Sequence, residues 1–301
     1  MKFINFKHSV IFFNLCILVS PIYQKTNYIL IIFCLFLILI IGISHGALDN
    51  IKGEKLFRLF GYKSNYLFYL SYILISLFII FSWLLLPSIV LLTFLIVASY
   101  HFGKEDTVFK VKRNFLLNEI LFFFKGSSVI IAPLLFQRDS TNEIFAILNF
   151  YVFENLFFNN FCLIIFLILS FFSNIYLSIG KSFEFKNIML LDYFSIIILN
   201  IFLTPVLAFT LYFCFLHSVR HSLNLISEMD KSFNKGLKKF ITKAIPLTLV
   251  TGLIFLISIY FLNNLYKIDE AIYKVIFIGL ASLTFPHILL EYLLEKNEKR
   301  T

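Results

Sequence analysis

Five of the six histidines of this chain lie in segments that are otherwise almost entirely apolar. Imidazole is the commonest metal ligand among side chains and a frequent proton-transfer group near neutral pH. Polar side chains inside apolar helices are costly and are retained mainly where they have a function. The five residues are His45, His101, His217, His221 and His287. Their types and setting predict a metal site built inside apolar helices.

The spacing of polar residues around these histidines favours a common site. His217 and His221 are four residues apart, so on a helix both rings project from one face, close enough to bind one metal ion. An acid follows each of the other three histidines after four residues, and a carboxylate on the second ring nitrogen would fix the orientation of a ligating imidazole. These acids are Asp49, Glu105 and Glu291. Capping of the helices at the water interface would explain each acid equally well.

The ligand types restrict the metal. Neutral imidazoles suit iron, copper, zinc or nickel, and the lack of a clear inward carboxylate or thiolate argues against calcium, magnesium or an iron–sulfur cluster. The four cysteines lie singly in apolar runs, so they indicate neither disulfides nor thiolate ligands. The H-E-x-x-H pattern of zinc intramembrane proteases is absent, and six histidines are too few for membrane di-iron desaturases and hydroxylases. A four-histidine shell would leave open positions on iron(II), whereas a structural zinc site is closed.

The elements that must position these histidines are membrane spans. With 60% hydrophobic and 14% charged residues, the chain is too apolar for a soluble domain. At about 20 apolar residues per crossing, we expect an all-α polytopic bundle of about ten spans, with eight as the lower bound, forming one integral membrane domain over residues 1–301. The expected spans are 9–23, 27–47, 66–85, 87–103, 115–136, 158–179, 187–203, 205–226, 244–263 and 272–293. The apolar run 144–153 is too short to cross, and we expect it at the interface.

The distribution of basic residues orients the predicted bundle. Ten spans place twenty Lys and Arg on one side of the membrane and four on the other. The positive-inside rule then puts both termini in the cytoplasm and the protein in the cell (inner) membrane. Each of the five histidines falls in the later part of a helix that runs inward, so all five share the cytoplasmic leaflet. The +9 net charge reflects this topology; because the charges are spread over short loops, they do not indicate nucleic-acid binding.

At these residues the chain resembles a known family. The ordered motifs are HGALD at 45–49, HFGKED at 101–106, HSVRH at 217–221 and PH at 286–287, and together they are similar to the Brp/Blh family of bacterial β-carotene 15,15'-dioxygenases. The resemblance implies a non-haem Fe(2+) cofactor held by four histidines, which map onto His45, His101, His217 and His221. Ser44 and Asn50 stand where the family pattern has Pro and a further His. These departures concern the extra His and not the ligand set.

The resemblance also implies a reaction. The enzyme would cleave β-carotene at its central double bond with O2, giving two molecules of retinal, and could hand the retinal to a rhodopsin. Because a carotene resides in the lipid bilayer, the site should open sideways to lipid. Two other classes also place polar residues in helices, namely an intramembrane transporter and a haem-binding electron-transfer protein. The sequence shows neither the repeats of a carrier nor histidines at two depths.

We also predict the roles or locations of several other polar residues. His287 could be a fifth ligand, an outer hydrogen-bonding partner of a ligand or a pocket residue, and the sequence does not choose among these roles. Tyr100, beside His101, is a candidate pocket residue. Arg220 is expected to pair with Asp192 or an acidic interface residue, and His8 to lie outside the spans, facing solvent.

Overall fold

The protein is a bundle of helices. The computed structural model describes residues 2–21, 28–44, 46–62, 66–111, 115–150 and 159–298, and within these ranges it contains no strand. Ten helical stretches among these residues are long and apolar enough to cross a membrane. This confirms the prediction of a polytopic helical membrane protein with about ten spans.

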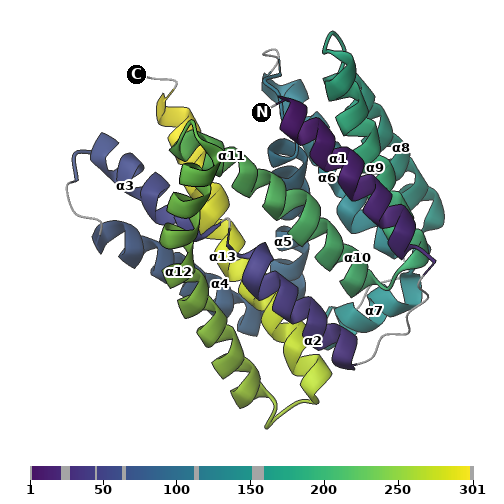
Figure 1. The fold of residues 1–301 in the computed structure, drawn as a ribbon. Helices are drawn as coiled ribbons and strands as arrows, with labels where there is room; N and C mark the ends of the chain where they lie inside the picture. The colour runs from purple at the N-terminus through teal and green to yellow at the C-terminus, as the bar shows by residue number, and fades with distance from the viewer. Residues whose placement is uncertain are drawn as a thin grey trace.

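The spans follow one another with short connections (Figure 1). The second span consists of α2 with the π-helical segment η1, followed by the short 3-10 helix η2 and by α3, and the eighth consists of α10, the π-helical segment η3 and α11. Helix α7 (Arg138–Ile147) is too short to cross. The other elements are α1 (Lys2–Val19), α2 (Tyr28–Leu37), η1 (Ile38–Gly42), η2 (Gly46–Leu48), α3 (Asp49–Leu59), α4 (Tyr66–Leu85), α5 (Pro87–Glu105), α6 (Phe115–Phe136), α8 (Asn160–Leu177), α9 (Phe183–Phe202), α10 (Pro205–Leu211), η3 (Tyr212–Ser218), α11 (Val219–Met229), α12 (Phe233–Leu262) and α13 (Ile268–Glu298).

Several helices extend beyond their predicted bounds. Helix α12 begins at Phe233 instead of residue 244, α13 runs from Ile268 to Glu298, and the second span continues through α3. The additional turns carry charged side chains, so hydropathy alone does not detect them. In α12 they are held by packing of Gly236 and Phe240, which are buried against α11. The short helix α7 starts at Arg138, before the predicted run 144–153, and residues 151–158 lie outside the described residues.

Two groups of helices flank a central group. Helices α1, α6, α8 and α9 pack together on one side, and α3, α4, α12 and α13 on the other (Figure 1). Helix α5 and the α10–η3–α11 span lie between them and contact both groups. The start of α1 and the end of α13 lie at the same end of the bundle, as an even number of spans requires. The histidines of α5, η3 and α11 are therefore carried by the centre of the fold, and that of α13 by a flanking helix that contacts α5.

The crossing of α5 and α6 depends on two glycines. A Cβ added at Gly103 would lie 1.8 Å from the carbonyl oxygen of Phe122, and one at Gly126 would lie 1.9 Å from the carbonyl oxygen of Ser99. The two backbones are therefore in direct contact, the arrangement that small residues allow between membrane helices. Because Gly103 is two residues from His101, this contact fixes the height and rotation of a candidate ligand.

We expect Gly126→Ala to lower the stability of the protein by about 1–3 kcal/mol, because the added methyl group must push α5 away from α6. Thermal unfolding in detergent measures this as a lower Tm. Gly252→Ala in α12 is the matched control, since a Cβ there meets nothing within 4 Å, and its Tm should be unchanged or slightly higher. Equal Tm values for the two variants would contradict the tight crossing.

Candidate metal centre and adjoining cavity

Four buried histidines lie side by side in the centre of the bundle. The ring centroid of His101 is 5.3 Å from that of His217 and 5.3 Å from that of His287. The His221 ring follows at 6.2 Å from His287. Each of the four side chains is at most 10% exposed. The structure thus brings together four of the five histidines singled out in the sequence, and His45 lies outside the described residues.

Asp49 orients His287 from another span. Both oxygens of its carboxylate lie 2.8 Å from Nδ1 of His287, and the hydroxyl of Tyr72 donates to Oδ2 at 3.0 Å. An acceptor on Nδ1 assigns the proton to that nitrogen and leaves the lone pair on Nε2, the atom that would bind a metal. Asp49 is 4% exposed, so its charge is balanced by these partners and not by water.

Asp106 orients His217 in the same way. Its Oδ1 lies 3.0 Å from Nδ1 of His217, and the Tyr212 hydroxyl donates to Oδ2 at 2.7 Å. Burial alone would raise the pKa of the Asp106 carboxyl, but the neighbouring His217 and the more distant charges of Arg220 and Lys125 hold it well below its usual range. The sequence did not single out Asp106, because the residue before it, Glu105, is the acid that stands four residues after His101. The second acid in HFGKED was the available signal.

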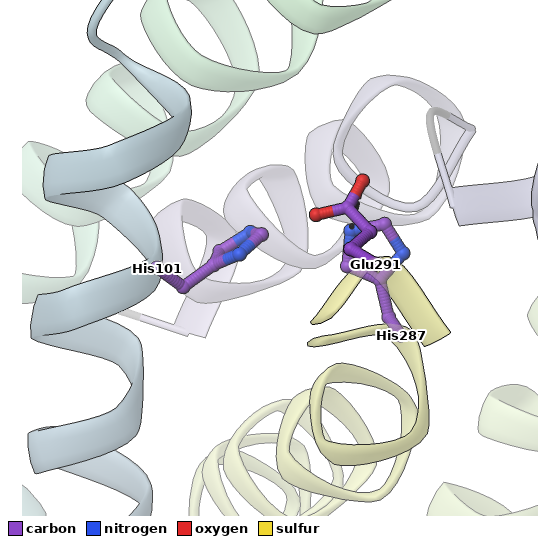
Figure 2. Close-up of side chains that lie close together, drawn as sticks. All are labelled: His101, His287 and Glu291. Carbon is purple, nitrogen blue, oxygen red and sulfur yellow. Dashed lines mark ion pairs between the residues drawn. The ribbon is translucent and has the colours of Figure 1, made fainter. Parts of the chain in front are cut away.

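Glu291 lies at the centre of the remaining polar contacts. Its Oε1 is 3.6 Å from Nε2 of both His221 and His287, and it accepts a hydrogen bond from Lys52 Nζ at 2.6 Å. Figure 2 shows His101 on α5 facing His287 and Glu291 on α13. Each of these three residues offers a ligand atom within 4.8 Å of the other two, close enough to hold one metal ion.

A second set of possible ligands shares Glu291. It combines Glu291 with Glu105 and His221, again with ligand atoms within 4.8 Å of one another, and Glu105 Oε2 lies 3.9 Å from Nε2 of His221. The spacing in the sequence pairs each acid with the histidine four residues before it. In the structure Asp49 binds His287 and Glu105 approaches His221, because the rings point inward where carboxylates of neighbouring helices meet them. Glu291 lies 3.6 Å from His287, as its spacing predicts, and His45, the histidine paired with Asp49, lies outside the described residues.

Other predicted residues lie elsewhere. The hydroxyl of Tyr100 binds Glu119, and its ring packs against a separate cluster that contains Phe122 and Met189. The expected ion pair of Arg220 with Asp192 is confirmed, with the guanidinium donating to both carboxylate oxygens at 2.5 and 2.9 Å.

The prediction for the sixth histidine was wrong. His8 belongs to α1 and lies partly buried, with Nε2 2.7 Å from the carbonyl oxygen of Phe215. The first span begins at Lys2, earlier than the apolar run suggested, because the helix continues over the polar residues around His8.

A cavity of about 400 Å³ adjoins the histidine cluster. His101, His287 and Asp49 line one end, and the far end is lined by apolar side chains of α4, α5, α10, α12 and α13. Four lining residues on α4 and α12 are each more than half exposed, at 54–55%: Ile73, Leu77, Val250 and Ile254. Because the same side chains face both the cavity and the outer surface of an apolar bundle, the cavity borders the lipid between α4 and α12.

We expect Asp49→Asn to lower the affinity of the cluster for a transition metal by about 10- to 100-fold, because the amide no longer holds the His287 ring with a charged acceptor. Metal content of the purified protein, measured against a graded chelator series, tests this. Asp230→Asn is the control, since Asp230 pairs with Lys239 and not with a histidine. Unchanged metal affinity in Asp49→Asn would remove this carboxylate from the site.

The chain is similar to proteins of known family. Residues 36–295 match the family model described as Beta-carotene 15,15'-dioxygenase. Over 275 residues the chain is 29% identical to a Beta-carotene 15,15'-dioxygenase from an uncultured marine bacterium (66A03), and the aligned region covers 88% of this chain and 94% of that protein. No solved structure matches the chain.

Proposed function

The chain belongs to the β-carotene 15,15'-dioxygenase family, and from that premise we propose that it cleaves β-carotene at the central double bond with O2 to give two molecules of retinal. As a member of this family it is a carotenoid-cleaving oxidoreductase. The observation that carries the specific reaction is the buried histidine cluster at the end of an apolar cavity that borders lipid. The family match favours this reaction over the transporter and haem-protein alternatives.

Iron(II) is the metal that we assign to the cluster. The donors fit it, because buried neutral imidazoles suit iron, and two of them carry a carboxylate on the outer nitrogen, as ligating histidines commonly do. We propose His101, His217 and His221 as ligands together with His45, as the family motifs imply, and His287 as a further ligand. Bound iron(II) would supply the activation of O2 that a dioxygenase needs.

The protein's own residues would do three things in this reaction. Asp49 and Asp106 hold the His287 and His217 rings in the ligating tautomer. The apolar side chains of the cavity exclude water from the polyene. Because His101 and His287 also line the cavity, a polyene bound there lies against the histidine cluster. The exposed cavity residues of α4 and α12 provide a route from the lipid bilayer, where a carotene dissolves.

The cellular setting is also proposed. We infer that the whole chain, residues 1–301, forms one integral domain in the cell (inner) membrane with both termini in the cytoplasm, because basic residues concentrate on one set of loops. The cluster would then lie in the cytoplasmic leaflet. Retinal released there into lipid could pass directly to a rhodopsin apoprotein.

We expect expression in β-carotene-accumulating cells to bleach the carotene colour and produce retinal. His101→Ala should lower the rate of retinal formation by at least about 100-fold, because loss of an outer partner already costs about 10- to 100-fold and this residue is a proposed ligand. His8→Gln is the control, since His8 lies outside the cluster and its ring contacts the backbone carbonyl of Phe215. Unchanged carotene in cells that contain folded, iron-loaded protein would contradict the proposed function.

Iron content distinguishes the proposed ligands from one another. We expect His45→Ala and His287→Ala each to lose most of the bound iron when the proteins are purified at matched chelator concentration, because each would remove one imidazole from the metal. The same measurement on Tyr100→Phe should give wild-type iron, since the Tyr100 hydroxyl binds Glu119 instead. Full iron in His287→Ala would leave that residue with only a role in the cavity wall.

A further inference from the structure

Three buried apolar side chains line the cavity about two helical turns from the histidines. Phe94 of α5, Phe255 of α12 and Leu280 of α13 line it and are 7%, 5% and 4% exposed. The Phe255 ring lies against Gly279, where an added Cβ would be 2.3 Å from its Cζ, and the Phe94 ring lies 6.4 Å from that of Phe285. We call these three side chains, Phe94, Phe255 and Leu280, the cavity floor. They are immobilised by neighbours, so the floor is a fixed stop.

The depth of the floor follows from helix geometry. Phe94 precedes His101 by seven residues in α5, and Leu280 precedes His287 by seven residues in α13. At a rise of 1.5 Å per residue, both floor residues stand about 10.5 Å along their helices from the two histidines that line the cavity. Two helices from different parts of the chain therefore give the same depth.

This depth is about the length of one polyene arm of the proposed substrate. An extended all-trans chain advances about 1.2 Å per covalent bond, so the roughly nine bonds from a central carbon of β-carotene to the first carbon of its ring span about 11 Å. A ring whose first carbon lies level with the floor residues would bring the central double bond near His101 and His287. A hydrocarbon ring also suits the floor chemically, because every floor side chain is apolar and offers no partner to a polar substituent.

On the basis of the proposed function, we propose that the cavity floor selects the bond that is cleaved. The ring of one half of the carotenoid rests on Phe94, Phe255 and Leu280, and the other half extends toward the lipid-bordering side between α4 and α12. Cleavage breaks one carbon–carbon double bond and places one oxygen atom of O2 on each carbon, so the central bond yields two equal aldehydes. A bond away from the centre yields two carbonyl products of unequal length, and a carbon that bears a methyl group becomes a ketone. The floor decides whether the two products are equal.

The test compares product lengths from wild type, Phe94→Leu, Leu280→Ala and Ile80→Ala in β-carotene-accumulating cells, by chromatography and mass spectrometry. Wild type should give retinal. The variants should add unequal pairs of carbonyl products, one longer and one shorter than retinal and one of them a ketone where the cleaved carbon bears a methyl group, because a ring that sinks by about 1 Å lowers correctly placed cleavage by roughly 100-fold. Ile80 also lines the cavity, eight residues along α4 from Tyr72, whose hydroxyl binds Asp49, and it is only partly buried, so its variant should fold even if the two floor variants do not.

Leu92→Ala is the matched control. Leu92 lies on α5 two residues before Phe94 and is 43% exposed, so this variant should give retinal alone. If wild type forms no aldehyde, the proposed function fails and the role of the floor falls with it. If wild type forms retinal and every folded cavity variant also forms only retinal, the proposed function stands and the role of the floor is overturned. Unequal products from Leu92→Ala as well would equally overturn it.

Discussion

The structure depends on the need to neutralise carboxylates buried inside an apolar bundle. An ionised carboxylate removed from water must be paired and hydrogen-bonded, because an isolated buried charge is prohibitively costly. Asp49 meets this need with His287 and Tyr72, and Asp106 with His217 and Tyr212. Each pair joins different spans, so the same contacts that satisfy the charge hold the helices in register and fix the orientation of each imidazole.

Helix irregularity contributes to this arrangement. Tyr212 and His217 are five residues apart, yet both side chains reach Asp106. The π-helical segment η3 contains both residues, and its wider turn brings positions five apart onto one face. A second π-helical segment, η1, packs beside it, where Ser218 Oγ donates to the carbonyl oxygen of Gly42 at 3.0 Å. The two irregular segments therefore support each other next to the histidine cluster.

Polarity changes along the cavity, and this gradient links structure to chemistry. The end that holds His101, His287 and Asp49 can retain a cation, whereas the floor at Phe94 and Phe255 favours hydrocarbon. A long apolar molecule lowers its free energy by burying one end against the floor side chains, which brings its interior bonds toward the polar end. The exposed residues of α4 and α12 connect this gradient to lipid, so binding and access follow from the same walls.

The sequence by itself determined the membrane bundle, its number of spans and the residues that could form a site. Apolar runs near the thickness of a bilayer and histidines within them are local signals, and the ordered motifs around His101 and His217 carried the family. The tertiary structure decided which groups meet. Asp49 pairs with His287, 238 positions away, Asp106 orients His217 and Glu105 approaches His221, because helix rotation and crossing set these contacts. The π-helical segments and the depth of the cavity floor are likewise products of packing, which no local pattern of residues records.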